Sequence, residues 1–226
     1  MIVRVPALLS ADQLAAARAL LADAPWTDGR VTAGYQSARV KENLQLPEDC
    51  EASRKLRDSV LAALERNPLF IAAALPARVF PPLFNRYEVG QTFGAHVDNA
   101  IRQVTGTAHR IRTDISATLF LNAPEDYDGG ELIVEDTYGA HMAKLAAGDM
   151  ILYPATSLHR VTPVTRGYRI AAFFWVQSMV KDDGERTILF DLDRAIADLT
   201  RATPESPALV RLTACYHNLI RRWAEI

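Results

Sequence analysis

The pair His96 and Asp98 is the first feature of this sequence that could do chemistry. The two residues lie two positions apart in Gly94-Ala-His96-Val-Asp98, within a segment predicted to be a strand. Side chains two apart on a strand project from the same face, so an imidazole nitrogen and a carboxylate oxygen can reach one point. A His-x-acid pair arises by chance about 0.6 times in a chain with 5 His and 27 acidic residues. Alone, the pair indicates a surface ion pair or hydrogen bond more than a metal site.

His159 adds a third donor of the kind that binds a metal ion. It follows His96 by 63 residues, in Tyr153-Pro-Ala-Thr-Ser-Leu-His159. Two imidazoles and one carboxylate form the facial triad that binds Fe(II), with three ligands on one face of an octahedron. The opposite face stays free for a bidentate co-substrate and O₂. The carboxylate is a hard, anionic ligand that supports higher oxidation states of iron.

Arg169 follows His159 by ten residues, behind a turn predicted at Arg166-Gly167. The turn predicts a hairpin that places Arg169 beside the strand carrying His159. An arginine inside an apolar barrel needs an anionic partner, because a buried unpaired charge is costly. A carboxylate that accepts both arms of the guanidinium suits it best. The carboxylate belongs either to a bound molecule or to a protein side chain at the rim of the barrel.

The composition excludes several classes of protein. The chain has 226 residues, of which 49% are hydrophobic and 23% charged, as in one folded domain and not in a disordered or fibrous chain. A formal net charge of −2 does not indicate the basic surface that would bind nucleic acid or an anionic membrane. Cys50 and Cys215 are too few for a disulfide framework and are expected to be free thiols. Without a signal-peptide core or a long apolar run, we expect a cytoplasmic protein with no membrane partner.

The segment 76–180 is predicted to be a β domain. Short runs rich in Val, Ile, Phe, Tyr and Thr alternate with Gly, Pro, Asn and Asp clusters, which is typical of a sandwich or barrel. About eight such runs favour a jelly roll. The candidate strands are Arg78–Tyr87, Phe93–Asp98, Asp114–Leu121, Glu131–Glu135, Ala143–Leu145, Met150–Tyr153, Ser157–Pro163 and Arg169–Gln177.

The segment 1–75 is predicted to be mainly helical and to pack on this core. Ser10-Ala-Asp-Gln13 is a capping-box pattern that begins a helix predicted over Ala11–Ala24. Pro47 is expected to open a second helix as a first-turn residue. Between them, the polar stretch 26–36 is expected to be a surface loop that could reach over a site.

The segment 181–226 is predicted to be helical again, which gives an α+β chain overall. Thr203 is expected to cap the last helix. The apolar stripes of both helices are expected to pack against the β core, and a homo-oligomer formed through the last helix is left open. The stripes are Leu189, Leu192, Ile196 and Leu199, then Leu209, Leu212, Tyr216, Leu219 and Trp223.

Taken together, these motifs resemble the Fe(II)/2-oxoglutarate-dependent dioxygenases of the prolyl-4-hydroxylase type. The order His-x-Asp, a His about sixty residues later and an Arg ten beyond it carries the resemblance. Over both flanks as well, the chain resembles the bacterial PKHD-type hydroxylases (the YbiX/PiuC group). Further matching stretches are Asn85 to Tyr87 followed by Gly90, Thr118 to Asn122, Asp128 to Leu132, Gly148 to Pro154, Ser10 to Leu14 and Asp28 to Gly34.

The resemblance implies a double-stranded β-helix in which His96, Asp98 and His159 hold Fe(II). It implies that Arg169 binds the distal carboxylate of 2-oxoglutarate and that Tyr87 adds a hydrogen bond; the alternative for Tyr87 is a packed strand residue. It also implies O₂ as co-substrate, ascorbate as reductant, and release of succinate and CO₂ on hydroxylation. The substrate is a small molecule or a peptide, with a siderophore and bacterial iron uptake among the options. Weaker candidates for the site are Ser116 and Thr118.

Alternative functions use the same ligands. A zinc hydrolase would activate water on the two histidines and the aspartate, but leaves Arg169 without a role. A sensor would bind iron or 2-oxoglutarate without turnover. Other polar residues are expected at the surface. His109 is expected in a polar loop or lid and His141 in a turn. A basic run is expected either to be solvated or to attract an anionic substrate. The run consists of Arg102, Arg110 and Arg112.

Overall fold

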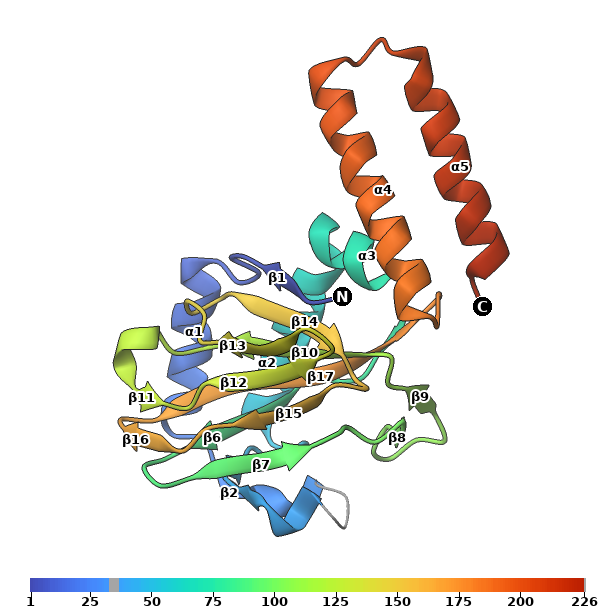
Figure 1. Ribbon diagram of the computed structural model, residues 1–226. Helices are drawn as coiled ribbons and strands as arrows, with labels where there is room; N and C mark the ends of the chain where they lie inside the picture. The colour runs from blue at the N-terminus through green and yellow to red at the C-terminus, as the bar shows by residue number, and fades with distance from the viewer. Residues whose placement is uncertain (33–36, 226) are drawn as a thin grey trace.

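The computed structural model describes residues 1–32 and 37–225 and is centred on two antiparallel sheets (Figure 1). The major sheet consists of β1 (Val3–Val5), β2 (Thr27–Asp28), β4 (Leu44–Gln45), β5 (Pro76–Val79), β6 (Leu83–Tyr87), β10 (Ile115–Phe120), β14 (Met150–Pro154) and β17 (Arg169–Ser178). Its order is β1-β14-β10-β17-β6-β4-β2, and β5 also pairs with β17.

The minor sheet lies against the major sheet and closes the jelly roll. Its order is β13-β12-β15-β7-β3. The predicted α+β jelly roll is confirmed. The strands of the minor sheet are β3 (Lys41–Glu42), β7 (Thr92–His96), β12 (Leu132–Asp136), β13 (Gly139–Ala143) and β15 (Leu158–Val161). Separate pairs join β8 (Ile101–Gln103) to β9 (Arg110–Arg112) and β11 (Asp128–Gly129) to β16 (Val164–Arg166).

Strand β17 shows how the sequence separates the core from the site. Alternate side chains of a strand face opposite sides of the sheet. Ile170, Ala172, Phe174 and Val176 join the apolar cluster that packs on the helices. Arg169, Phe173 and Trp175 instead line a pocket between the two sheets. Both faces of the strand are covered, so its sequence is almost continuously apolar apart from Arg169.

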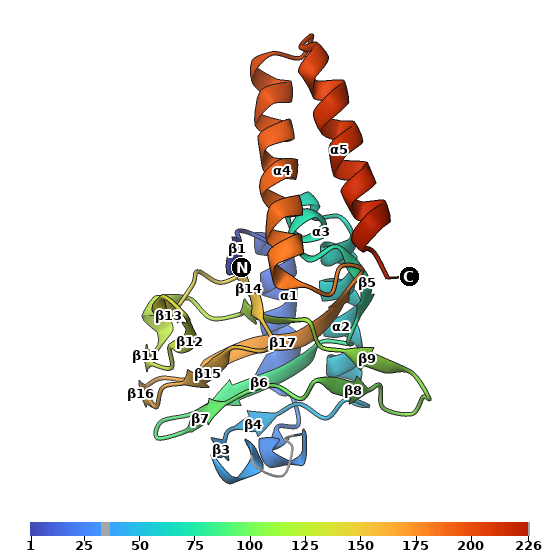
Figure 2. The same ribbon diagram turned by 45° about the vertical axis from the view of Figure 1, so that its right-hand side comes forward.

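The N-terminal helices cover the outer face of the major sheet (Figure 2). They are α1 (Ala11–Ala22), α2 (Glu51–Glu65) and α3 (Pro68–Ala74). The capping box of Ser10 and Gln13 is confirmed. The expectation that Pro47 opens α2 was wrong: Cys50 caps the helix, because the Pro47 carbonyl closes a turn with the Cys50 amide before the helix begins.

The C-terminal helices α4 (Asp183–Ala202) and α5 (Pro207–Trp223) form a hairpin that projects away from the sheets (Figures 1 and 2). Leu189 is buried with Leu75 and Val180, and apolar residues of α5 pack on this cluster. The expectation that both stripes pack on the β core was therefore wrong. Thr203 does not cap α5 either, because its amide bonds to the Leu199 carbonyl and completes α4.

Several predicted strand boundaries were also wrong. The run 78–87 is broken into β5 and β6, because Pro81 and Pro82 donate no backbone hydrogen bond. The strand predicted at 143–145 is β13, which pairs with β12 as a hairpin. Segment 1–75 contributes short strands to both sheets, too short to show an alternating pattern. Both Cys50 and Cys215 are free thiols, as predicted.

Short 3₁₀ turns complete the described chain, at η1 (Gly29–Thr32), η2 (Ser37–Arg39) and η3 (Pro124–Asp126). The stretch 26–36, expected to be a loop over the site, holds β2 and η1, while its last four residues lie outside the described residues. Within residues 1–32 and 37–225, no helix has the length and hydropathy needed to cross a membrane.

Candidate active site

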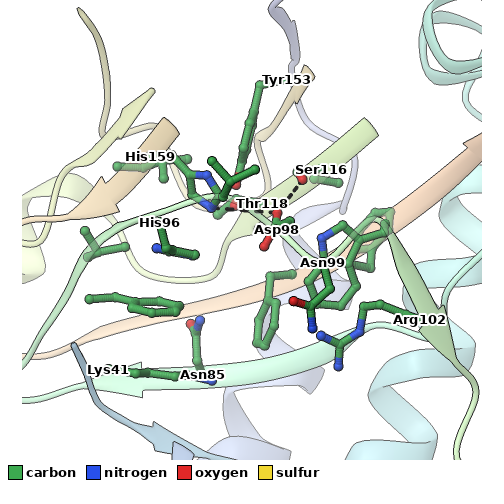
Figure 3. A pocket seen from close by; sticks show the side chains of 18 of the residues that line it. Lys41, Asn85, His96, Asp98, Asn99, Arg102, Ser116, Thr118, Tyr153 and His159 are labelled. Carbon is green, nitrogen blue, oxygen red and sulfur yellow. Dashed lines mark hydrogen bonds and ion pairs between the residues drawn. The ribbon is translucent and has the colours of Figure 1, made fainter. Parts of the chain in front are cut away.

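His96 and His159 lie on neighbouring strands of the minor sheet. β7 pairs with β15 in a register that places the two histidines opposite each other, and their ring centroids are 4.2 Å apart. Asp98 comes just after β7 ends, so the strand is shorter than predicted. One ligand atom from each of the three side chains lies within 4.8 Å of the others (Figure 3). The structure thus brings together the three residues whose spacing suggested a metal site.

Backbone carbonyls orient both imidazoles. His96 Nδ1 lies 2.8 Å from the Gly94 oxygen, and His159 Nδ1 lies 3.0 Å from the Ser157 oxygen. Because a carbonyl oxygen can only accept a hydrogen bond, each Nδ1 carries the proton and donates it. The Nε2 atom of each ring is then the one with a free lone pair. This is how metal-binding histidines are held in proteins.

The environment favours neutral imidazole at His96. Burial, together with the nearby His159, lowers the pKa of His96 to about 4. The ring also stacks on Phe93, with centroids 3.6 Å apart and planes inclined by 18°. A neutral, immobilised ring is ready to donate its Nε2 lone pair to a metal without first losing a proton.

Asp98 is held by a hydrogen bond from the opposite sheet. Ser116 Oγ of β10 donates to Asp98 Oδ2 at 2.6 Å, and the same carboxylate oxygen lies 3.7 Å from His159 Nε2. Ser116 was a weak candidate in the sequence, and its side chain orients the carboxylate. Thr118, two residues further along β10, also lines the pocket.

Arg169 begins β17 and lies deep in the same pocket. Only 1% of its surface is exposed, and its guanidinium carbon lies 5.4 Å and 5.2 Å from the ring centroids of Tyr87 and Phe120. Among the described residues, no carboxylate lies within 4.0 Å of it, and its Nε has no hydrogen-bond partner. The alternative of a protein carboxylate at the barrel rim is therefore wrong for the described part of the chain.

The route by which Arg169 reaches the site differs from the prediction. β17 pairs with β6 and β10 of the major sheet, and not with β15. The hairpin expected to place Arg169 beside His159 was wrong, because β16 leaves the minor sheet to pair with β11. Arg169 therefore faces the histidines across the space between the sheets.

Gly130 leaves room for the arginine. A Cβ atom at this position would lie 3.2 Å from Arg169 Cδ and 3.0 Å from a ring carbon of Tyr127. The backbone of Gly130 also has a φ of +67°, which glycine adopts without steric cost. The turn at residues 128–130 thus fits close against the arginine side chain.

Tyr87 is paired in register with Arg169 and is buried beside it. Burial raises the pKa of Tyr87 to about 12, and the charge of Arg169 opposes that rise. The phenol is therefore protonated at neutral pH and can donate a hydrogen bond. Tyr153 of β14 also lines the pocket, 5.1 Å from His159 between ring centroids, and burial raises its pKa as well.

Full-length relatives decide the family. A PKHD-type hydroxylase of Saccharophagus degradans is 58% identical over 225 residues, covering all of this chain and all of that protein. The PKHD-type hydroxylase PiuC of Pseudomonas aeruginosa is 54% identical over 226 residues, again over both full lengths. The chain belongs to the PKHD-type hydroxylases.

Other comparisons agree with this family. The model of the 2OG-Fe(II) oxygenase superfamily matches residues 82–177, and that of the PKHD-type hydroxylase C-terminal domain matches residues 183–225. A Pseudomonas putida prolyl-4-hydroxylase has the same fold, with a TM-score of 0.53 at 20% identity over 78% of this chain and 92% of that one. This PKHD-type hydroxylase is an oxygenase whose family implies Fe(II), 2-oxoglutarate and O₂.

The pocket of this PKHD-type hydroxylase also contains residues that the sequence did not single out. Lys41 of β3 is 3% exposed, and its Nζ donates to Gln45 Oε1 at 3.1 Å. Burial lowers the pKa of Lys41 to about 8, and the charge of Arg102 adds to that effect. Asn85 of β6 lies between these cations in Figure 3, and its Oδ1 has no partner among the described residues. A two-residue strand such as β3 gives no pattern from which its inward side could be predicted.

The remaining histidine and arginine candidates of this hydroxylase differ in whether they lie at the surface or in the pocket. His109 is exposed between β8 and β9, and His141 pairs with Asp136 at 2.7 Å on the surface. In the basic run, Arg110 is exposed and Arg112 pairs with Asp114 at 2.7 Å. Arg102 alone of that run lines the pocket.

Proposed function

We propose that His96, Asp98 and His159 of this PKHD-type hydroxylase bind Fe(II), and that Arg169 binds the distal carboxylate of 2-oxoglutarate. One observation carries the proposal: a buried guanidinium, which has no carboxylate partner in the described part of the chain, faces the same pocket as a His-Asp-His cluster. A dicarboxylic 2-oxo acid fits both, since one end can chelate a metal while the other pairs with the arginine.

The donor set fits Fe(II). Two neutral imidazole nitrogens and one carboxylate oxygen are the ligands of non-heme iron oxygenases, and none of the residues that line the pocket is a cysteine that would favour a softer metal. Three protein ligands leave coordination positions for the 2-oxo acid and O₂. The hydrolase alternative uses the same ligands but gives Arg169 nothing to bind.

When bound, iron supplies oxidative decarboxylation of 2-oxoglutarate by O₂ coupled to hydroxylation of a substrate C–H bond, so that succinate and CO₂ leave. The side chains of the pocket position the co-substrate and exclude water. Arg169 holds the distal carboxylate with both guanidinium arms, and Tyr87 donates a hydrogen bond from its protonated phenol. Ser116 fixes the rotation of the Asp98 carboxylate, and the ring of Phe93 covers His96.

The test is anaerobic titration of the protein with Fe(II) and 2-oxoglutarate. We expect the weak visible charge-transfer band of a 2-oxo acid chelated to iron, and its loss in His96→Ala. Subsequent exposure to O₂ should release succinate, which a non-catalytic sensor would not do. A protein that gives no band, and that hydrolyses esters with Zn²⁺ alone, would contradict the proposal.

The finer statements stay predictions. Ascorbate as reductant and a siderophore-related substrate linked to iron uptake rest on the resemblance. The cytoplasmic location and the homo-oligomer rest on the pattern of the sequence. The division into segments 1–75, 76–180 and 181–226 also stays a prediction. Succinate release measured over peptides and siderophore-like compounds would identify the class of substrate.

A further inference from the structure

The pocket has a second positively charged end, formed by Arg102 of β8. Its guanidinium carbon lies 4.1 Å from the centroid of the Trp175 ring and 5.2 Å from that of Phe80. Figure 3 shows the Arg102 side chain reaching into the pocket beside Asn99. Stacking on the ring faces holds the guanidinium plane in place and leaves its N–H edge to bind an anion.

Among the residues that the structure describes, Arg102 has no carboxylate partner. Within the described chain no carboxylate oxygen lies within 4.0 Å of its guanidinium, and its buried Nε donates to nothing. The acidic groups close enough to affect it are Asp98 and Glu48. Asp98 is a proposed iron ligand, and Glu48 accepts a hydrogen bond from Thr105 Oγ1 at 3.2 Å. When Asp98 holds the metal, Glu48 remains the acidic group near Arg102, and in the described chain it forms no ion pair with the guanidinium.

Aromatic rings of β17 connect Arg102 to a second cation. Phe173 and Trp175 lie on the same face of the strand, with ring centroids 5.7 Å apart. Lys41 Nζ lies 5.7 Å from the Phe173 ring, just as Arg102 lies against the Trp175 ring. The result is an apolar wall with a positive charge at each end.

The Trp175 end of this wall lies far from Arg169. Arg169 and Trp175 are six residues apart on β17, which corresponds to about 20 Å along an extended strand. A five-carbon dicarboxylate held at Arg169 is too short to reach Arg102. Arg169 and Arg102 line the same pocket, which is partly open to solvent.

We propose that the substrate of this hydroxylase carries a carboxylate that binds Arg102, next to an apolar portion that lies against Phe173 and Trp175. Val97, which is 47% exposed, also lines the pocket and adds to its apolar surface. This assignment rests on the proposed function, because it places the second molecule in the same pocket. It names the class of substrate as an organic carboxylate with an adjoining apolar group.

The test uses 3-phenylpropanoate as the probe, with its neutral amide and inorganic phosphate as comparisons. Binding is followed by calorimetry and by quenching of tryptophan fluorescence, in full-length protein saturated with Fe(II) and 2-oxoglutarate under argon. The variants are Arg102→Gln, Arg102→Lys, Arg169→Gln and, as matched control on the exposed face of β9, Arg110→Gln. Binding of 2-oxoglutarate is measured separately in each.

We expect the carboxylate to bind the parent protein and the amide to bind about tenfold less tightly or worse, since hydrogen bonds to charged groups contribute on that scale. Arg102→Gln should lose its affinity for the probe and keep its affinity for 2-oxoglutarate. Arg102→Lys should keep part of the affinity for the probe. Arg110→Gln should bind the probe as tightly as the parent protein does. Arg169→Gln should lose its affinity for 2-oxoglutarate, so it is titrated with Fe(II) alone, and it should keep its affinity for the probe.

Three results would overturn the assignment: equal probe binding in Arg102→Gln, equal binding of acid and amide, or no binding of the acid to the parent protein. Tighter binding of phosphate than of the carboxylate would overturn the class of substrate. Retention of 2-oxoglutarate by Arg169→Gln counts against the proposed function alone, so the two failures are distinguishable.

Discussion

Arg169 and Arg186 are equally buried, at 1% and 2% exposure, but they differ in what they contact. Arg186 Nη1 donates to the carbonyl oxygens of Val180 and Lys181, each at 2.7 Å, and Nη2 donates to Asp183 at 2.9 Å. Arg169 lies between aromatic rings, with no carboxylate nearby in the described chain. Arg186 therefore connects α4 to the turn before it, whereas Arg169 faces the pocket.

The comparison shows that burial of a charge does not by itself indicate function. A buried charge whose hydrogen bonds are satisfied by the chain stabilises the fold, whereas removing one partner of such a pair is costly. A buried charge that the chain leaves uncompensated lowers stability and indicates a ligand. The two arginines should therefore respond oppositely to substitution in stability and in ligand binding.

The largest effect is expected at Arg169. Arg169→Gln should weaken 2-oxoglutarate binding by about 100-fold or more, because truncating one partner of a buried charge pair costs at least ~2–5 kcal/mol. Its melting temperature without ligand should stay the same or rise, since an uncompensated charge is removed. Calorimetry and thermal unfolding measure both quantities; a large loss of stability with unchanged affinity would reverse the roles assigned to the two arginines.

Arg186→Ala should lower stability by about 2–3 kcal/mol, because it leaves buried carbonyl groups without donors. The affinity for 2-oxoglutarate of the folded molecules should not change. Urea unfolding and calorimetry on the same preparation separate the two effects. A variant that is as stable as the parent protein would show that these hydrogen bonds do not hold the C-terminal hairpin in place.

Gly130→Ala should weaken 2-oxoglutarate binding and cost about 1–2 kcal/mol of stability, since the added methyl group overpacks the space beside Arg169. Gly106→Ala is the matched control, because its φ of +74° is similar but nothing lies within 4 Å of the added atom. Both variants carry backbone strain, so a difference between them isolates the contacts of the added methyl group with Tyr127, Val164 and Arg169. Equal 2-oxoglutarate affinity in the two would show that these contacts do not affect the position of Arg169.

The smallest effect is expected at Ser116. Ser116→Ala should weaken Mn²⁺ or Fe(II) binding about tenfold, since groups that orient metal ligands contribute 10- to 100-fold to affinity. The affinity for 2-oxoglutarate at saturating metal should change less. Thr200→Ala, which removes an exposed hydroxyl of α4, serves as control. Metal titration of both variants checks the result, and a loss equal in the two would remove Ser116 from the site.

The core of the site was predictable from the types and spacing of its residues. His96 and Asp98 follow from their two-residue spacing, although Asp98 lies just beyond the end of β7. His159 follows from the type of donor, and Arg169 from the cost of burying its charge. The hairpin predicted for Arg169 was wrong because strand spacing does not tell which of two facing sheets a strand joins.

The rest of the site could not be predicted from local patterns. Lys41 reaches the pocket through β3, a two-residue strand that pairs with β7 about fifty residues later in the chain. Arg102 differs from its neighbours Arg110 and Arg112 only in its partners: Asp114 and Glu225 neutralise Arg112, and Arg110 faces solvent. Such differences depend on contacts between distant segments.

The most direct test of the role of Arg169 compares 2-oxoglutarate with 2-oxopentanoate, which has the same chain length but lacks the distal carboxylate. Calorimetry in the presence of metal gives the ratio of their affinities in the parent protein and in Arg169→Gln. We predict a large preference for 2-oxoglutarate in the parent and nearly equal affinities in the variant. The same preference in both proteins would show that another group binds the distal carboxylate and would contradict the role assigned to Arg169.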